Sequence, residues 1–287
     1  MSIQNEYSLL DSGHFRKLES VGPYILIRPA PQAMWSPRLP ISEWKKADAE
    51  FVRYENGRGE WEFRGRKIPE SWSVKINKIP FIIKLTDFGH IGVFPEHLQE
   101  FNRIRECLSN SNLKPFKCLN LFAHTGALTL SLAQAGAHLV HLDASKKSVD
   151  WARENARIAG LEKEPVRWIV DDVKKFVSKE IRRGAKYDGI ILDPPSFGRG
   201  SKNEVWKIEE DLLLLLGDLS KLFSEQFSFL FLTCHTPGVT GTVMQNMIQS
   251  FVPKSGKFES GELTLKEEKS SRHLPSGFFS LWLHDRG

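Results

Sequence analysis

The sequence predicts an α/β protein in which a seven-stranded, mostly parallel sheet follows a small β-rich domain. Residues 120–193 repeat the order of apolar strand, loop and helix, which is typical of such sheets. Glycine stands just past three expected helix ends, at Gly136, Gly160 and Gly184. Residues 1–85 are instead rich in proline and tryptophan and carry short alternating apolar runs, which favour strands over long helices.

The size and composition of the chain agree with two domains, expected at residues 1–85 and 86–287. A length of 287 residues exceeds the typical size of one compact domain, and 40% hydrophobic with 26% charged residues is ordinary for a globular protein. The formal net charge of +5 permits an anionic partner without requiring one.

In the amino-terminal domain, the alternation over 24–28 predicts a strand. Apolar and aromatic residues flank Asn56-Gly57 across 51–63, which is a strong hairpin signal. A further strand is expected over 79–85. The apolar spacing over 96–109 then predicts a helix that links the two domains.

The second domain is expected to be Rossmann-like, because strands and helices alternate regularly from Pro115 onward. A last pair of consecutive strands implies one antiparallel insertion at the end of the sheet. The expected strands are 117–122, 139–142, 166–170, 188–192, 227–233, 257–266 and 277–284. The expected helices are 127–135, 145–159, 172–183, 205–223 and 239–250.

Cysteine spacing and hydropathy exclude several classes of protein. Cys107, Cys118 and Cys234 are too widely spaced for a zinc knuckle or redox motif, so we expect neither a metal nor a disulfide framework. The first fifteen residues have no apolar core of signal-peptide type. The longest aliphatic run, 212–216, is far shorter than the ~20 residues that span a bilayer. We therefore expect a cytoplasmic protein without membrane contact, and nothing indicates its oligomeric state.

The first candidate site segment is Asn120–Gly126, which follows a strand and opens a helix. In open parallel sheets, ligands bind at the carboxyl ends of the strands. The small residues Ala123, Thr125 and Gly126 would let a ligand approach the main chain closely. The glycine-rich dinucleotide fingerprint and a phosphate-binding Lys-Ser/Thr loop are both absent. The alternative is a plain strand–helix turn.

Polar residues follow the next two strands. Asp143 could accept the two hydroxyls of a ribose or cap the following helix, and Ser145, which can cap by itself, favours the ligand. Asp172 offers the same choice between ligand and cap. Asn155 stands within a helix, where it either braces the ligand loop or lies on a solvated face.

The segment Asp193–Phe197 is the most specific of the candidates. Pro194 and Pro195 remove two amide donors, so a carboxylate and carbonyls remain to accept from an exocyclic amine, and Phe197 could stack a planar base. The alternative is a simple strand terminator. Residues 198–203, with Arg199 and Lys202, are expected to form a basic loop that is either a lid or merely solvated.

Cys234 ends the fifth strand beside that corner. It could be a nucleophile, which requires a lowered pKa and some exposure, or a small buried hydrophobic residue.

With these motifs in view, the chain from about Asp87 onward resembles class I S-adenosylmethionine (SAM)-dependent methyltransferases. Within them it is similar to the bacterial group of large-subunit ribosomal RNA cytosine-5 methyltransferases. The resemblance covers about two thirds of the chain. Its motifs are Asn120–Gly126, Asp143, Asp171–Val173, Asp193–Phe197 and the closing strand pair, and Gly92–Glu96 is similar to a turn that flanks the cofactor.

The resemblance implies SAM as cofactor and RNA, most of all ribosomal RNA, as partner. It implies that the 120–126 loop holds the methionine part, Asp143 the ribose, and Asp172 and Val173 the adenine. The implied cofactor residues are Phe94, Asn120, Phe122, Ala123, Thr125, Gly126, Asp143, Ala144, Asn155, Asp172, Val173, Asp193 and Pro194. Catalysis would fall to Asp193 and Cys234, and substrate binding to Pro195, Phe197, Arg199 and Lys202.

Two departures from that group leave the acceptor open. His235 follows Cys234, where the group has a serine-rich context, and residues 1–85 do not match its usual RNA-binding modules. The alternatives are an exocyclic nitrogen, an acceptor other than RNA, or a non-catalytic RNA-binding protein that retains the fold. Arginine and aromatic residues interleave at 53, 54, 58, 61 and 64, where they either contact the acceptor or pack on their own core.

Overall fold

The computed structural model describes residues 6–54, 58–97, 104–105, 108, 114–200 and 204–285. The chain forms two compact units, each with its own core. The first unit is Met1–Leu98 with Thr264–Ser276, and the second is Gln99–Leu263 with Gly277–Gly287. Beyond the expected border at residue 85, the first unit thus continues to Leu98 and takes in a second segment far along the sequence.

The first unit is rich in strands, with a five-stranded sheet in the order β1-β2-β3-β4-β5 and a separate pair, β6 and β7. Within the hairpin predicted around Asn56-Gly57, β4 and β5 pair antiparallel and place Phe51 opposite Trp61; the turn itself lies outside the described residues. The strands are β1 Tyr7–Gly13, β2 Arg16–Val21, β3 Tyr24–Pro29, β4 Ala49–Arg53, β5 Gly59–Phe63, β6 Trp72–Ile76 and β7 Ile79–Ile83. The helices are α1 Ile41–Trp44 and the 3-10 turn η1 Pro95–His97.

The segment 264–276 is joined to the first unit by a small core and by hydrogen bonds. Leu265 and Leu274 pack with Leu9 in one buried cluster. The hydroxyl of Ser12 donates to Oε1 of Glu267 over 2.6 Å, and both residues are buried. Residues far apart in sequence therefore share one core.

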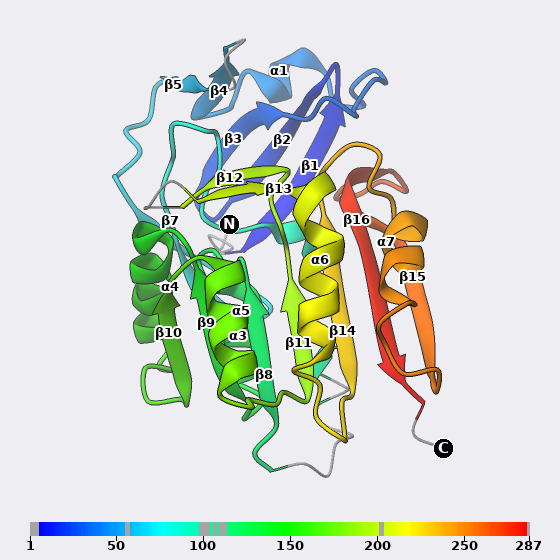
Figure 1. Cartoon of the computed structure of the whole chain (residues 1–287). Helices are drawn as coiled ribbons and strands as arrows, with labels where there is room; N and C mark the ends of the chain where they lie inside the picture. The colour runs from blue at the N-terminus through cyan, green and yellow to red at the C-terminus, as the bar shows by residue number, and fades with distance from the viewer. Residues whose placement is uncertain are drawn as a thin grey trace. The chain divides into compact units, whose positions relative to one another are not determined.

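The second unit contains the predicted seven-stranded sheet, in the order β10-β9-β8-β11-β14-β16-β15 (Figure 1). The first five of these strands are parallel, and β16 runs antiparallel to β14, as predicted for the closing pair. The strands are β8 Lys117–Leu121, β9 His138–Asp143, β10 Val166–Val170, β11 Gly189–Leu192, β14 Phe229–Cys234, β15 Gly256–Lys266 and β16 His273–His284. The helices are α3 Ala127–Ala133, α4 Lys146–Ile158, α5 Val173–Arg182, α6 Ile208–Ser220 and α7 Gly241–Ile248.

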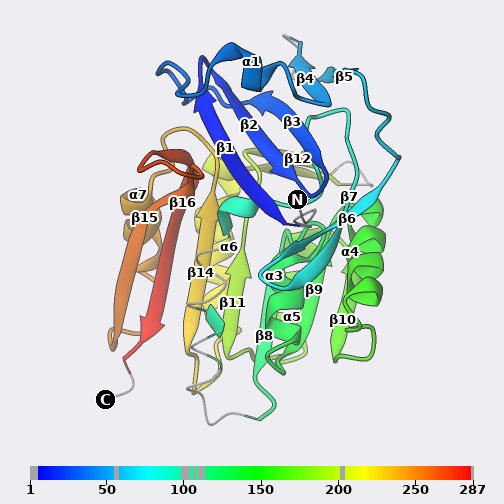
Figure 2. The same cartoon turned by 180° about the vertical axis from the view of Figure 1, so that it is seen from behind.

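Helices cover both faces of this sheet. Val173 and Phe176 of α5, with apolar residues of α6 and α7, form one core cluster with alternate strand residues such as Val140 and Leu142. Figure 1 shows these three helices in front of the sheet, and Figure 2 shows the sheet from behind. His141 alternates with Val140 and Leu142 and faces α3 on the other side. The continuous apolar strands are thus explained by burial on both faces.

Three expected elements differ from the structure. Residues 205–207 form a short strand, β13 Val205–Lys207, rather than the start of a helix, because they pair with β12 Phe197–Arg199. The first part of the expected basic loop is therefore strand. β16 begins at His273 instead of 277. Of the expected helix over 96–109, Pro95–His97 is a 3-10 turn and Ile104, Arg105 and Leu108 are helical, while the rest lies outside the described residues.

None of the helices in the described ranges combines the length and apolar character that a bilayer-spanning segment needs.

Candidate active site

The sheet topology brings the predicted site segments to one edge. The strands β8, β9, β10, β11 and β14 are parallel, so their carboxyl ends share an edge, and β8 lies between β9 and β11 where the strand order reverses. In open α/β sheets this switch point is the ligand crevice. Asn120–Gly126, Asp143, Asp172, Asp193 and Cys234 all lie at or directly after these strand ends.

The loop after β8 has an unusual backbone conformation. Phe122, His124 and Gly126 have φ values of 54°, 48° and 88°, in the left-handed region that favours glycine. A Cβ atom at Gly126 would lie 3.1 Å from the Cβ of Ala152, so glycine is needed for both the turn and the close helix packing. Ala123 donates its amide to the carbonyl of Leu142 over 3.0 Å, which ties the loop to β9.

Asn155 stabilises this loop through a hydrogen bond. Its side chain is fully buried, and Nδ2 donates to the carbonyl of Thr125 over 2.9 Å. The alternative of a solvated helix face is therefore wrong for this residue. An asparagine is costly within a helix, and here its amide fixes the loop that would face a ligand.

Asp143 joins two loops and does not cap the helix that follows. Its carboxylate accepts from the amide of His124 over 2.9 Å and from that of Ser145 over 2.8 Å. Ser145 is the N-cap of α4 and accepts from the amide of Ser148. A carboxylate has about four acceptor positions, so Asp143 retains capacity for hydroxyl donors. Its neighbour Ala144 is exposed.

Asp172 acts as a helix cap in the structure. It is the N-cap of α5, and Oδ1 accepts from the amide of Lys175 over 3.0 Å. Asp171 accepts from the amide of Asp172 over 2.9 Å, so the end of β10 has a fixed shape. Val173, the next residue, is buried at the start of the helix.

A buried polar network beneath the crevice was not predicted. Asn120 donates to the hydroxyl of Thr129 over 2.9 Å, and that hydroxyl lies 2.9 Å from Nδ1 of His141. All three residues are buried. Burial lowers the pKa of His141 to about 3, although a backbone hydrogen bond with His124 acts in the opposite direction. The available signal was polar residues at 120, 129 and 141 inside otherwise apolar elements.

We expect the neutral state of His141 to make the fold sensitive to acid. Below about pH 6.5 His141 is protonated in the unfolded chain but stays neutral in the folded chain. The free energy of unfolding therefore falls as the pH drops toward about 3. The loss is about 1.4 kcal/mol per pH unit once the pH is below the unfolded pKa. Urea unfolding at several pH values from 7 to 4.5 measures it. His141→Asn should have a shallower slope than the wild type, whereas the exposed His138→Asn should not; equal slopes would contradict the assignment.

The corner after β11 is rigid and rich in acceptors. Thr233 donates to Oδ1 of Asp193 over 2.6 Å. Nε1 of Trp206 donates to the carbonyl of Pro195 over 2.7 Å, so this carbonyl is already used. The acceptors of this corner are thus the Asp193 carboxylate, whose Oδ1 also lies 3.9 Å from Nε2 of His235, and the carbonyl of Pro194. The sequence did not predict the participation of Trp206.

Two of the residues proposed for substrate binding, Phe197 and Arg199, lie on the short strand β12. Phe197 is 53% exposed, and the guanidinium carbon of Arg199 lies 5.8 Å from the centroid of its ring. Pro195 is exposed as well. Lys202 lies outside the described residues.

Cys234 has the surroundings of a buried thiol. It is 0% exposed and belongs to the apolar core cluster. Its Sγ accepts from the amide of Thr236 over 3.3 Å, and burial raises the pKa of the thiol, which two interactions with Thr236 only partly offset. A nucleophilic cysteine needs a lowered pKa and exposure, which is the opposite environment.

In the first unit, Phe94 lies between His90 and His97, with ring centroids 5.4 and 5.9 Å apart. Of the interleaved aromatic residues, Trp61 packs on Phe51 and donates to the carbonyl of Thr86, so it belongs to its own unit. Tyr54, in contrast, is 44% exposed.

Comparison with known proteins agrees with this geometry. A family model described as S-adenosylmethionine-dependent methyltransferase matches residues 51–233. The chain belongs to this family; it is an enzyme that uses SAM, rather than a non-catalytic binding protein.

Particular relatives narrow the likeness further. A SAM-dependent methyltransferase from Agrobacterium tumefaciens is 37% identical, covers 97% of this chain and 90% of its own, and has a TM-score of 0.93. The ribosomal RNA large subunit methyltransferase K/L of Pseudoalteromonas atlantica is 29% identical and covers 70% of this chain but 26% of its own. The ribosomal RNA large subunit methyltransferase K of Neisseria meningitidis is 26% identical over 62% of this chain and 44% of its own. The chain thus spans less than half the length of these two relatives.

The donor set fits SAM. The cofactor carries ribose hydroxyls and an amino group but no phosphate, and the crevice offers carboxylates without a phosphate loop. Asp143 would hold the ribose, and the loop of Ala123–Gly126 would lie along the methionine part. When bound, SAM supplies an electrophilic methyl group.

Proposed function

We propose that this enzyme methylates a nitrogen atom of an RNA base, an exocyclic amine in the first instance. Support for RNA comes from the ribosomal RNA methyltransferases to which the chain is similar, and from its net charge of +5. Support for a nitrogen acceptor comes from one observation: the hydrogen-bond acceptors of Asp193 and Pro194 lie at a strand end next to Cys234, whose thiol is buried in the core.

The residues of this corner would orient the exocyclic amine and accept a proton from it. An exocyclic amine shares its lone pair with the ring, so it is a poor nucleophile. Two acceptors, the Asp193 carboxylate and the Pro194 carbonyl, would take its two N–H groups and draw them out of the plane of the ring, which weakens the conjugation and leaves the lone pair on the nitrogen. As the new N–C bond forms, the bond between the methyl group and the sulfonium sulfur would break, with S-adenosylhomocysteine as the leaving group. The nitrogen becomes positively charged, and Asp193 stabilises that charge and is placed to take the proton. Thr233 holds the carboxylate in position.

The exposed aromatic ring next to the corner supplies the remaining requirement. A base must leave its stack to present the amine, and Phe197, 53% exposed, offers a face on which it can stack. The arginine above that ring adds positive charge for a phosphate.

Cytosine carbon 5 is the acceptor that the sequence first suggested, and methylation there would require Cys234 to be a nucleophile. That carbon becomes nucleophilic only after a thiolate adds at carbon 6. Cys234 is buried and its thiol pKa is raised, so this proposal gives the residue a packing role.

We expect Cys234→Ala to retain methyl transfer within a few-fold and to lose about 1–2 kcal/mol of stability, because a small buried side chain is shortened. Transfer of labelled methyl to RNA and urea unfolding measure the two effects. Cys118→Ala, equally buried in β8, is the matched control for packing. Loss of all turnover in Cys234→Ala alone, with a covalent adduct on RNA that contains 5-fluorocytosine, would favour carbon 5 instead.

The direct experiment uses the wild-type chain, labelled SAM, and total RNA or total protein from bacterial cells. We expect label in RNA, in a nucleoside methylated on nitrogen after digestion and chromatography. Label in an amino acid, or on carbon 5 of cytosine, would contradict the proposal.

We further propose that the enzyme works in the cytoplasm, where ribosomal RNA is made in bacteria.

We also propose that residues 1–85 act as a substrate-binding domain, with Arg53, Tyr54 and Arg58 as contact residues. The exposure of Tyr54 supports this role. Tyr54→Ala should weaken RNA binding and leave the fold intact; deletion of the whole segment is unsuitable, because it would uncover Leu265 and Leu274.

A further inference from the structure

A basic pocket lies at the edge of the sheet opposite the cofactor crevice. It has a volume of about 530 Å³ and lies among the first residues of three parallel strands, Lys117 of β8, His138 of β9 and Val166 of β10. A strand of six residues such as β9 extends roughly 17–20 Å, so this pocket and the crevice cannot hold the same nucleotide. The methyl-transfer site does not use it.

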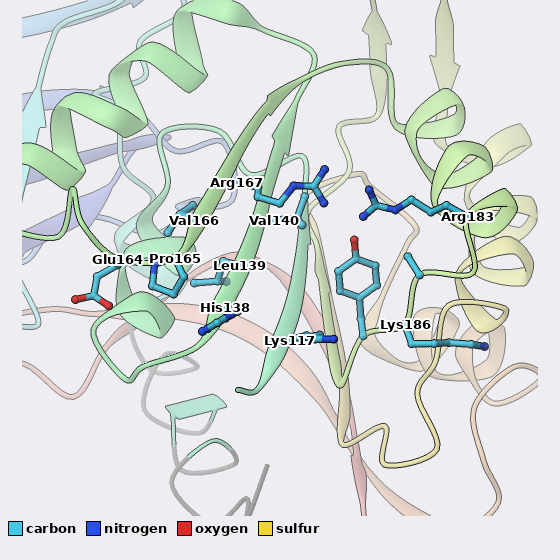
Figure 3. A pocket seen from close by; sticks show the side chains of 12 residues that line it. Lys117, His138, Leu139, Val140, Glu164, Pro165, Val166, Arg167, Arg183 and Lys186 are labelled. Carbon is cyan, nitrogen blue, oxygen red and sulfur yellow. The ribbon is translucent and has the colours of Figure 1, made fainter. Parts of the chain in front are cut away.

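The charge of this pocket is unbalanced. Its lining includes the cations Lys117, Arg167, Arg183 and Lys186, against the single acid Glu164. In Figure 3 the guanidinium groups of Arg167 and Arg183 point toward one another, while the carboxylate of Glu164 is turned away from them.

Two buried acids beside the pocket, Glu180 and Asp188, compensate part of this charge. Among the described residues, the side chains of Lys117 and Arg167 have no hydrogen-bond or ion-pair partner. Arg183 pairs with Glu180, a buried acid that also accepts from Tyr187. Lys186 donates to a backbone carbonyl, which leaves its charge intact. Like charges facing one another across a cavity are unfavourable unless an anion lies between them.

Helix α5 connects this pocket with the crevice. It begins directly after Asp172, at the crevice edge, and ends at Arg182, next to Arg183 in the pocket. Its exposed side bears Lys174, Lys175, Lys179 and Arg182, which with Ser178 line a second cavity of about 310 Å³.

The charges along the helix are available to a ligand. Lys174, Lys175 and Lys179 pair with Asp211, Glu204 and Asp171, but the lysine side chains are 43–57% exposed. Exposed pairs of this kind contribute about 0–1 kcal/mol and can exchange a carboxylate for a phosphate at little cost. Arg182 has neither an ion pair nor a hydrogen bond to its side chain within the described ranges.

We propose that the RNA strand whose base is methylated runs along α5, and that a phosphate group several nucleotides from that base lies in the pocket between Arg167 and Arg183. This rests on the proposed function. A row of cations along a helix fits a polyanion better than one small phosphate compound. A guanidinium group can donate two parallel hydrogen bonds to the oxygens of one phosphate. Apolar lining residues such as Leu139 and Pro165 leave room for a base beside the phosphate.

The test compares two double variants of the full chain. Lys117→Gln with Arg167→Gln removes two pocket charges, and Lys254→Gln with Lys257→Gln removes two exposed charges next to and within β15, at the opposite side of the sheet. The probes are a labelled single-stranded RNA of mixed sequence and inorganic phosphate as competitor. Affinity is measured by fluorescence anisotropy from 50 to 300 mM salt. Calorimetry with S-adenosylhomocysteine checks that each variant is folded.

The pocket variant should bind the RNA about tenfold more weakly, with a salt slope smaller by about 0.7 for each phosphate that the protein no longer neutralises. The control variant should match the wild type. Equal affinity and slope in the two variants would overturn the proposal. So would phosphate that binds through Lys117 and Arg167 without affecting RNA, which would mark a site for a free anion. If the wild type methylates RNA but the pocket variant binds normally, only this inference fails; if the wild type methylates only protein, the proposed function fails.

Discussion

Asp193→Asn is expected to lower the turnover of RNA methylation by roughly 10²–10³, the usual cost of removing one group that stabilises charge in the transition state. Asparagine retains the shape and can still accept the hydrogen bond from Thr233, but it cannot take the proton or balance the positive charge on nitrogen. Single-turnover transfer from labelled SAM to the RNA substrate measures the effect. Affinity for S-adenosylhomocysteine should change little, because the loop of Ala123–Gly126 and Asp143 is untouched.

Thr233→Val is the matched control for this prediction. It removes the 2.6 Å hydrogen bond to Asp193 but leaves the carboxylate in place, so it tests orientation alone. We expect an intermediate loss, on the order of tenfold, from a less well-placed carboxylate. An Asp193→Asn enzyme within about threefold of wild type, or one no slower than Thr233→Val, would show that the carboxylate has no role beyond structure.

Asp143→Ala is expected to have the largest effect on cofactor affinity. Each hydrogen bond between a carboxylate and a ribose hydroxyl contributes roughly 1.5–3 kcal/mol, so the loss of even one should weaken the binding of S-adenosylhomocysteine more than tenfold. The substitution also removes the acceptor for the amides of His124 and Ser145, which loosens the loop that follows β8. Isothermal calorimetry gives the affinity, and urea unfolding gives the accompanying loss of stability.

Ser145→Ala separates the two contributions. It removes the cap of α4, at a cost of about 1 kcal/mol in stability, and leaves Asp143 in place. We expect near-normal cofactor affinity from Ser145→Ala. If both variants weaken the cofactor equally, the role of Asp143 is to shape the loop and it does not contact the ribose.

The sheet and the composition of the crevice could be predicted because parallel strands leave a strong pattern. A buried run such as Gly189–Leu192 is apolar and is followed by a polar residue, and the carboxyl ends of parallel strands share one edge. The assignment of Ser145 as the cap of α4 followed from the same local chemistry.

Other features depend on tertiary packing, which leaves no local pattern in the sequence. The three-residue strand at Val205–Lys207 exists because it pairs with Phe197–Arg199, and its Trp206 then takes the carbonyl of Pro195. The network of Asn120, Thr129 and His141 joins three elements whose facing sides are set by that packing. The burial of Cys234 at the end of its strand could not be predicted either. Strand alternation indicates on which face of the sheet a side chain lies, but not which residues cover that face.

The division of the first unit into two segments affects how the chain can fold during synthesis. Leu9 and Ser12 are made early, yet Leu274 and Glu267, against which they pack, emerge only after the whole parallel sheet has been translated. Domains usually fold as they leave the ribosome, amino terminus first. Here the amino-terminal β-structure must wait with part of its core uncovered, so the last hairpin is the step that closes both cores. Chaperone dependence of the nascent chain should therefore persist until about residue 276 has emerged.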